Sequence, residues 1–95
     1  MSAPAELREI ARHVVWFKPP EQTLSNIDFF LGYLMAHGTY EEVKTAEKYF
    51  SKDDFRRALE HAPPGVFPAR AWAYWNTILG RVPVPEMPRR RFQRS

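Results

Sequence analysis

The stretch TYEEVKTAEKYFSKDDFRRAL, residues 39–59, decides the fold because it contains two helix starts. Thr39 is followed three residues later by Glu42, and Ser51 is followed in the same way by Asp54. A hydroxyl side chain with an acidic side chain three residues on is the pattern of a capping box, in which each side chain bonds the other residue's backbone N–H. The stretch therefore predicts two short helices joined by a tight turn. Their apolar faces are Val43, Ala46 and Phe50 in the first helix, and Phe55, Ala58, Leu59 and Ala62 in the second.

Two further helices are predicted before this stretch. Apolar residues recur with helical spacing over residues 4–17, and Lys18-Pro19-Pro20 then forces the backbone out of the helical region. The next helix is predicted from Ser25, whose hydroxyl can cap it, to His37. Gly38 follows as the expected left-handed C-cap.

A fifth helix is predicted after the break at residues 63–65. It begins at Phe67-Pro68 and ends at Gly80. Its apolar stripe is formed by Trp72, Trp75, Ile78 and Leu79, so we expect both tryptophans to be buried. No segment alternates with the period of a strand. The expected fold class is all-α, a compact bundle of about five short helices.

A chain of 95 residues provides material for one domain. We expect residues 1–80 to form this single helical domain and residues 81–95 to form an extended tail rich in proline and arginine. The net charge is +3, and residues 81–95 contribute +4 through five arginines and one glutamate, which leaves −1 for the rest. The predicted helical domain is therefore nearly neutral and carries a basic arm.

The composition excludes several classes of protein. There is no cysteine, so the chain has no disulfide framework, thiol nucleophile or thiolate metal site. The longest apolar stretch, residues 27–36, is about half as long as a membrane-spanning helix and contains Asp28. Charged residues interrupt the N-terminal region where the apolar core of a secretory signal would lie. We expect a cytoplasmic protein that does not enter a membrane.

Nothing in the sequence has the pattern of a catalytic, metal or cofactor site. His13, His37 and His61 lie near three different predicted helix ends, without the spacing of metal ligands. The acidic residues at 41–42 and 53–54 lie in first helical turns, where they stabilise the helix dipole without any other role. The four glycines are isolated and form no phosphate-binding loop. The sequence predicts a protein that is not an enzyme and needs no cofactor.

Two surfaces are candidates for binding a partner. The helix-turn-helix shape of residues 39–59 would present Lys52, Arg56 and Arg57 to nucleic acid, although residues 41–60 sum to −1 where a DNA-binding unit is expected to be basic. The aromatic residues outside the helical stripes, together with the basic arm, could instead contact a protein; they are Phe29, Tyr33, Tyr74, Arg89, Arg90 and Arg91. A helix buried on two sides is the alternative explanation for these three aromatic residues.

The order of landmarks along residues 13–92 resembles a family of small uncharacterised bacterial helical proteins. The landmarks are residues 29–35, HGTYEEV at 37–43, YFS at 49–51, DFRRAL at 54–59, WAYW at 72–75 and LG at 79–80. Members of that family are often encoded beside AbiEii-type nucleotidyltransferase toxins and are regarded as antitoxins. The resemblance implies a non-enzymatic interaction protein that binds and neutralises such a toxin, and it supplies no functional residues. A small helix-turn-helix regulator that binds nucleic acid is the alternative, and the oligomeric state stays open.

Overall fold

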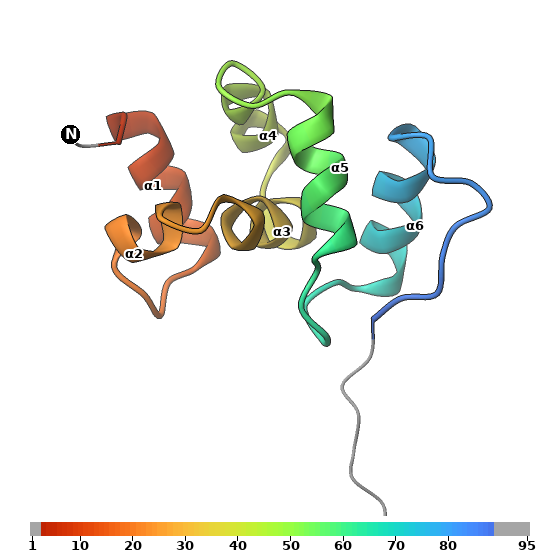
Figure 1. The fold of residues 1–95 in the computed structure, drawn as a ribbon. Helices are drawn as coiled ribbons and strands as arrows, with labels where there is room; N and C mark the ends of the chain where they lie inside the picture. Colours follow the sequence, from red (N-terminus) through yellow and green to blue (C-terminus); the bar gives the residue numbers. More distant parts are fainter. Residues whose placement is uncertain (1–2, 89–95) are drawn as a thin grey trace, which may run out of the picture.

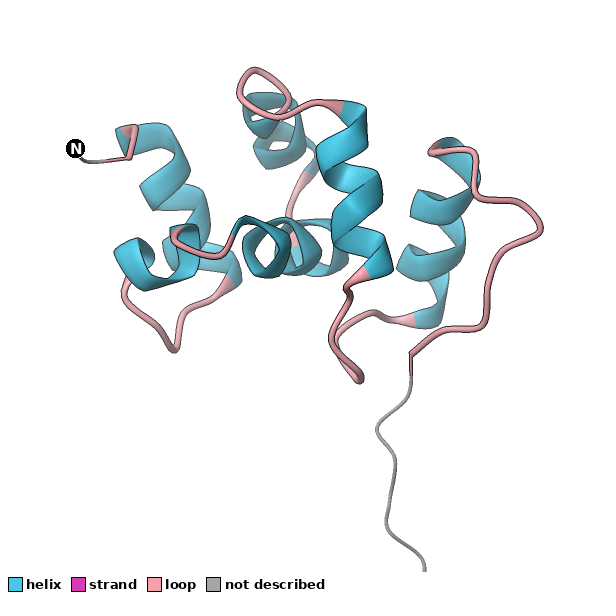
Figure 2. Ribbon diagram, viewed as in Figure 1, coloured by secondary structure: helices cyan, strands magenta, loops and turns pink. Residues whose placement is uncertain are grey.

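A computed structural model describes residues 3–88, and within this range all the regular secondary structure is helical (Figures 1 and 2). The all-α prediction is confirmed. The helices are α1 (Ala5–Val14), α2 (Pro20–Leu24), α3 (Ile27–His37), α4 (Tyr40–Ala46), α5 (Lys52–Glu60) and α6 (Ala69–Ile78).

Helix α3 is the centre of the fold and packs against each of the other helices. In Figure 1 it lies in the middle of the molecule, with α1 and α2 on one side and α5 and α6 on the other. Its side chains Phe30, Leu31, Leu34 and Met35 are buried. The hydrophobic core is therefore built around one helix rather than between two equal layers.

Both predicted capping boxes are present. The backbone N–H of Glu42 donates to Thr39 Oγ1 at 3.1 Å, and the N–H of Thr39 donates to Glu42 Oε1 at 2.9 Å. Ser51 and Asp54 make the same reciprocal pair at 3.2 Å and 2.9 Å. These bonds satisfy backbone donors that a helix start otherwise leaves without a partner. The beginnings of α4 and α5 are therefore fixed by bonds between residues three positions apart.

The region between α1 and α3 differs from the prediction. The first helix ends at Val14, and residues 20–24 form the additional short helix α2 with Pro20 at its first position. Proline is favoured at that position because its missing N–H would have no partner there, so the Pro-Pro pair both ends one helix and starts another. The prediction that Ser25 caps the next helix is also wrong. Asn26 is the N-cap, and its side chain accepts from the N–H of Phe29 at 3.2 Å.

Gly38 and Gly80 follow helix ends for different reasons. Gly80 has φ +82°, the left-handed conformation in which glycine is favoured. Gly38 has φ −78°, so the prediction of a left-handed C-cap is wrong there. An added Cβ at Gly38 would lie 2.6 Å from the carbonyl oxygen of Leu34 and would also meet the Leu34 Cδ1 methyl. Close approach to the last turn of α3, and not backbone conformation, therefore requires glycine at this position.

We expect Gly38→Ala to lower the free energy of unfolding by about 1–3 kcal/mol, because the added methyl group overpacks a site with no space for it. Urea denaturation of the variant measures this loss. Gly32→Ala is the matched control, since its added Cβ would meet nothing closer than Pro63 Cδ at 3.9 Å. Alanine is also the better helix former, so this control should be neutral or stabilising. Equal losses in the two variants would contradict the explanation.

Residues 81–88 contain no helix, and they fold back on α6. The indole N–H of Trp72 donates to the carbonyl oxygen of Pro85 at 2.8 Å, and Met87 packs against the core. Arg81 bonds Asn76 through both its backbone N–H and its guanidinium, at 2.8 Å and 3.0 Å. The first part of the predicted tail thus makes specific contacts with the last helix. Arg89, Arg90 and Arg91 lie outside the described residues.

Candidate functional site

Four aromatic side chains lie one beside the next in a row across one surface. We call them the aromatic ladder: Trp16, Phe17, Tyr33 and Phe29. The ring centroids of Trp16 and Phe17 are 5.5 Å apart, those of Phe17 and Tyr33 are 5.8 Å apart, and those of Tyr33 and Phe29 are 4.8 Å apart. Trp16 is 79% exposed and Phe17 is 49% exposed. The ladder is therefore a continuous aromatic surface with its largest ring in solvent.

The ladder is formed by the turn after α1 and by helix α3. Trp16 and Phe17 follow α1 in the turn that leads to α2, and the preceding residue, Val15, is fully buried. Phe29 and Tyr33 are four residues apart on α3, so they lie on one face of that helix. The buried side of the same helix carries the centre of the core. The rings are consequently attached to backbone that lies directly beside the core.

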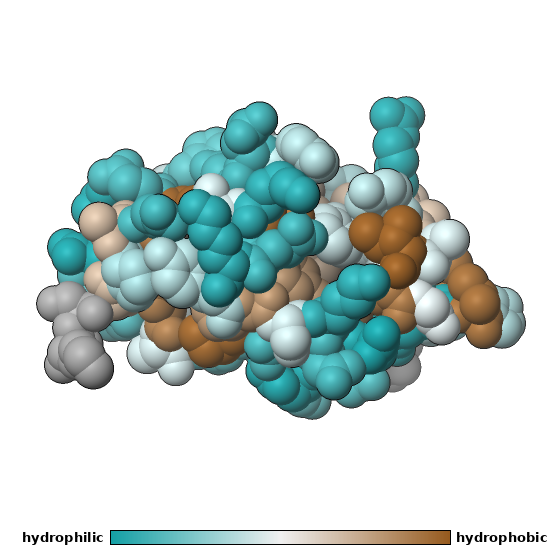
Figure 3. Space-filling model, turned by 90° about the horizontal axis from the view of Figure 1, so that it is seen from above, coloured by the Kyte–Doolittle hydropathy of each residue, from teal (hydrophilic) through white to brown (hydrophobic). Residues whose placement is uncertain are grey.

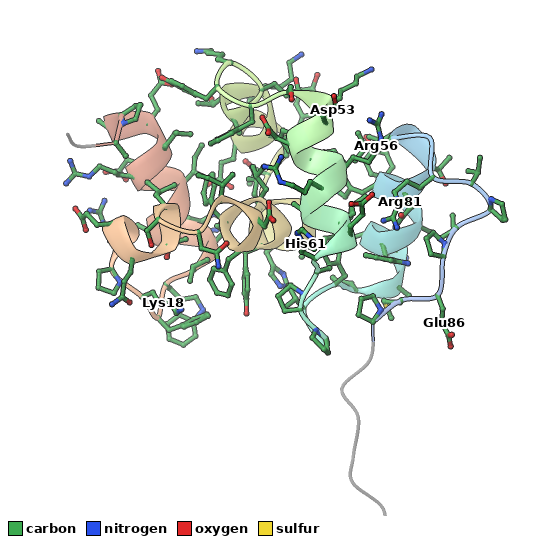
Figure 4. All side chains as sticks on the ribbon, viewed as in Figure 1. Lys18, Asp53, Arg56, His61, Arg81 and Glu86 are labelled. Atoms are coloured by element: carbon green, nitrogen blue, oxygen red, sulfur yellow. The ribbon has the colours of Figure 1, made fainter. Side chains whose placement is uncertain are left out.

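One cation lies on the ladder. The ammonium nitrogen of Lys18 is 4.5 Å from the centroid of the Phe29 ring, within the range of a cation–π interaction. Figure 4 shows Lys18 at the turn between α1 and α2. The indole N–H of Trp16 and the hydroxyl of Tyr33 have no hydrogen-bond partner among residues 3–88. The surface thus combines apolar ring faces with one positive charge and two polar groups that are free to bond.

Phe29 and Tyr33, two of the predicted partner-binding residues, are in contact on the ladder, whereas Tyr74 is not part of it. Tyr74 lies on α6, is 57% exposed and packs edge-on against Trp75. The sequence interpretation missed Trp16 and Phe17 because it assigned them to the apolar run of the first helix. Their position directly before Lys18-Pro19-Pro20 was the available signal. The prolines disfavour helical backbone in the residues before them, so the helix ends early and its buried face does not extend to Trp16 and Phe17.

A groove runs along α6 and forms the second candidate surface. Two adjoining hollows of about 240 Å³ and 460 Å³ share Glu47, Trp75 and Ile78 in their walls. Ile78, which lies on the predicted apolar stripe of this helix, is 48% exposed at the edge of this groove. In Figure 3 hydrophobic side chains gather over α6 and the segment after it, while the α4–α5 part of the same face is largely hydrophilic. Tyr74 lines the groove and not the ladder.

The three candidate nucleic-acid-binding residues differ in whether their side chains are bonded to other residues of the fold. Lys52 is exposed at the start of α5. Arg56 donates through Nε to the carbonyl oxygen of Leu79 at 3.0 Å and through Nη1 to Asp53. Figure 4 shows Arg56 between α5 and α6. Arg57 donates to Asp28 at 3.0 Å and to Asp54 at 3.2 Å. Two of the three cations are therefore bonded within the fold.

Two histidine–carboxylate pairs connect the end of one helix to the start of another. His61, after α5, places Nδ1 2.7 Å from Asp28 in the first turn of α3. His13, in the last turn of α1, places Nδ1 2.8 Å from the Glu42 carboxylate of α4. Partial burial acts to raise the pKa of Asp28, but the hydrogen bonds from His61 and Arg57, together with their charges, lower the pKa below its ordinary value. The pKa of Asp54 is also lowered, mainly by the backbone N–H of Ser51.

These two carboxylates predict a loss of stability in acid. A carboxyl group with a lowered pKa in the folded state stabilises the fold above its unfolded pKa of about 4, and this contribution is lost as the pH falls through the folded value. Urea denaturation should give a lower free energy of unfolding near pH 2 than at neutral pH. Asp28→Asn should be less stable than the wild type at neutral pH, where the ion pair with Arg57 is lost, and should approach it in acid. A deficit that is the same at both pH values would contradict the assignment.

Within residues 3–88 no three histidine or acidic side chains come together as a metal site would require. No helix of this described part has the length and apolar character needed to cross a membrane. Comparison of the chain with protein-family models, with curated proteins and with solved structures finds no match. The candidate surfaces are therefore interpreted from their own chemistry.

Proposed function

We propose that this protein is a non-enzymatic interaction protein, the antitoxin that binds and neutralises a nucleotidyltransferase-type toxin. The observation that carries the interaction role is the aromatic ladder, whose Trp16 is 79% exposed. Tryptophan and tyrosine are enriched among the residues that dominate binding energy at protein interfaces, and large contiguous apolar patches are uncommon on monomers. In this proposal the protein acts in the cytoplasm and has no catalytic residues of its own.

The class of the partner comes from the sequence resemblance. The landmarks that carry this resemblance include residues 29–35, and this stretch supplies Phe29 and Tyr33 of the ladder. A nucleotidyltransferase reading frame next to the gene would support the proposal, and an isolated gene would count against it. The ladder is the surface that we expect the toxin to cover.

The second candidate, a helix-turn-helix regulator, rests on two short consecutive helices, α4 and α5, and on exposed Lys52 at the start of α5. The carboxylates that hold Arg56 and Arg57 weigh against it, because a cation bonded within the fold has less to offer a phosphate. Wild-type binding to DNA that falls steeply with salt and is weakened by Lys52→Ala would support this candidate. Replacing Arg57 is less informative, since it also removes an ion pair of α3.

The test of the proposal is rescue of cells that express the neighbouring toxin, combined with binding of the two purified proteins. Trp16→Ala should weaken binding about 30-fold or more, the effect of losing a dominant interface residue. Tyr74→Ala removes a comparably exposed aromatic ring outside the ladder and should retain binding and rescue. Failure of the wild type to bind or neutralise the toxin would refute the proposed function. Loss of binding in the Tyr74 variant alone would indicate that the toxin binds the groove along α6 and not the ladder.

A further inference from the structure

We propose that the aromatic ladder binds an extended, proline-containing segment of its partner that also carries a carboxylate. This inference rests on the proposed function, because it assigns a chemistry to the surface that the partner would cover. The ladder offers ring faces, two polar groups without partners in the described part of the chain, and one cation. Each of these features selects among the kinds of segment that could bind.

The ring arrangement favours proline. The planes of Trp16 and Phe17 meet at 85° and those of Phe17 and Tyr33 at 66°, so flat faces and ring edges alternate along the surface. Proline rings pack into such aromatic-lined surfaces, which is the basis of polyproline II recognition. A proline-rich segment is already extended before it binds, so it loses little conformational entropy.

The free donors favour an extended segment over a helix. The Trp16 indole N–H and the Tyr33 hydroxyl have no partner among residues 3–88. A polyproline II segment has no internal hydrogen bonds, so each of its carbonyl groups is available to accept one. The carbonyl groups in the middle of a helix are already bonded within that helix. The backbone of an extended ligand can therefore satisfy the ladder's donors, whereas a helix can do so only through its side chains.

The chain contains an internal example of this contact. The indole N–H of Trp72 donates to the Pro85 carbonyl at 2.8 Å, where residues 81–88 fold back on α6. Residues 82–88 include three prolines and, within the described range, no helix. A tryptophan of this protein thus already holds a proline-containing segment through its N–H. Trp16 offers the same group from a more exposed position.

The charge on the ladder favours a carboxylate in the bound segment. Lys18 lies on Phe29, whereas the nearby carboxylate of Asp28 is bonded to Arg57 and His61. The charge of the ladder is therefore positive, and a carboxylate in the bound segment would complement it. Nucleic acid and an anionic membrane each require several clustered cations for strong binding. A single lysine among four aromatic rings fits an acidic, proline-containing peptide better.

The test uses the full chain and synthetic peptides of equal length. One peptide is built from the repeat Pro-Pro-Glu, a second from proline alone, and a third is an alanine- and glutamate-rich helix. Trp72 and Trp75 are buried, so a change in the fluorescence of the exposed indole reports on Trp16. We expect the Pro-Pro-Glu peptide to shift this emission to shorter wavelength and to bind more tightly than polyproline. Lys18→Ala should remove the difference between these two peptides.

Variants of the ladder provide the controls, with binding followed by chemical shifts of the labelled protein. Trp16→Ala should weaken binding of the Pro-Pro-Glu peptide at least about tenfold. Tyr33→Phe keeps the ring and removes the hydroxyl, so a loss of a few-fold is expected. Tyr74→Ala should bind as the wild type does. Equal or tighter binding of the helical peptide, or no response at Trp16 to any peptide, would overturn the inference.

Two further outcomes separate this inference from the proposed function. Toxin binding that depends on Trp16, without binding of either proline peptide, would refute the inference and leave the antitoxin proposal standing. Binding of the Pro-Pro-Glu peptide by a chain that binds no toxin would refute the antitoxin proposal and support the inference. Phosphatidylserine vesicles that shift Trp16 emission when the peptides do not would assign the ladder to a membrane surface and overturn the inference.

Discussion

Trp75→Ala is expected to lower the free energy of unfolding by about 3–5 kcal/mol, the usual range for removing a large buried aromatic side chain. The Trp75 ring is 8% exposed and stacks on Phe55 of α5, with centroids 5.8 Å apart and planes 13° apart. Its indole N–H donates to the carbonyl oxygen of Met35 at 3.0 Å. The substitution would leave that buried carbonyl of α3 without its donor and would open a cavity between three helices.

Urea denaturation followed by circular dichroism measures the loss at Trp75. The neighbouring residue supplies the control, because Tyr74 is 57% exposed and contacts Trp75 only along the ring edge. Tyr74→Ala should change the free energy of unfolding by less than about 1 kcal/mol. Similar losses at the two positions would show that α6 is not held by its buried face.

Phe30→Ala is expected to cost a similar amount, about 3–5 kcal/mol. Phe30 is fully buried on α3, and its ring lies 6.2 Å from that of Phe50 in the turn before α5. A small domain has a total stability of about 5–15 kcal/mol, so this variant is expected to lose a large share of the total and to unfold at a much lower temperature than the wild type. Thermal unfolding monitored at the helical band provides the measurement.

A milder substitution keeps the Phe30 prediction testable if the alanine variant does not fold. Phe30→Leu retains an apolar side chain and should lose only part of the stability, with a melting temperature between those of the wild type and the alanine variant. A wild-type melting temperature in Phe30→Ala would mean that α3 is not the centre of the core.

The sequence was sufficient for several features that depend on neighbouring residues. The capping boxes at Thr39 and Ser51 join residues three positions apart, and both are present. The burial of Trp72 and Trp75 followed from helical spacing and is confirmed. The short helix α2 was missed although its signal is local, because Pro20 can either end a helix or occupy its first position, and the prediction took the first meaning.

The candidate surface depended on contacts between distant parts of the chain, which the sequence alone does not give. Phe17 meets Tyr33 only because α1 and α3 pack together and place the turn after α1 beside the exposed face of α3. Arg57 is bonded to Asp28, twenty-nine residues away, so its loss as a free cation could not be predicted from the charge of its own helix. Residues 29 and 33 were identified because they fall outside the buried stripe of one helix.

The bond from Trp72 to Pro85 has a consequence for where the chain can be cut or joined to another protein. Within residues 3–88 the last helix ends at Ile78, but contacts with the helical core continue to Met87. Shortening the chain to Gly80 would take the carbonyl away from the Trp72 indole and uncover one side of α6. A fusion partner attached after Pro88 would leave both contacts in place. The last helical residue and the last residue that the folded unit requires are therefore different positions.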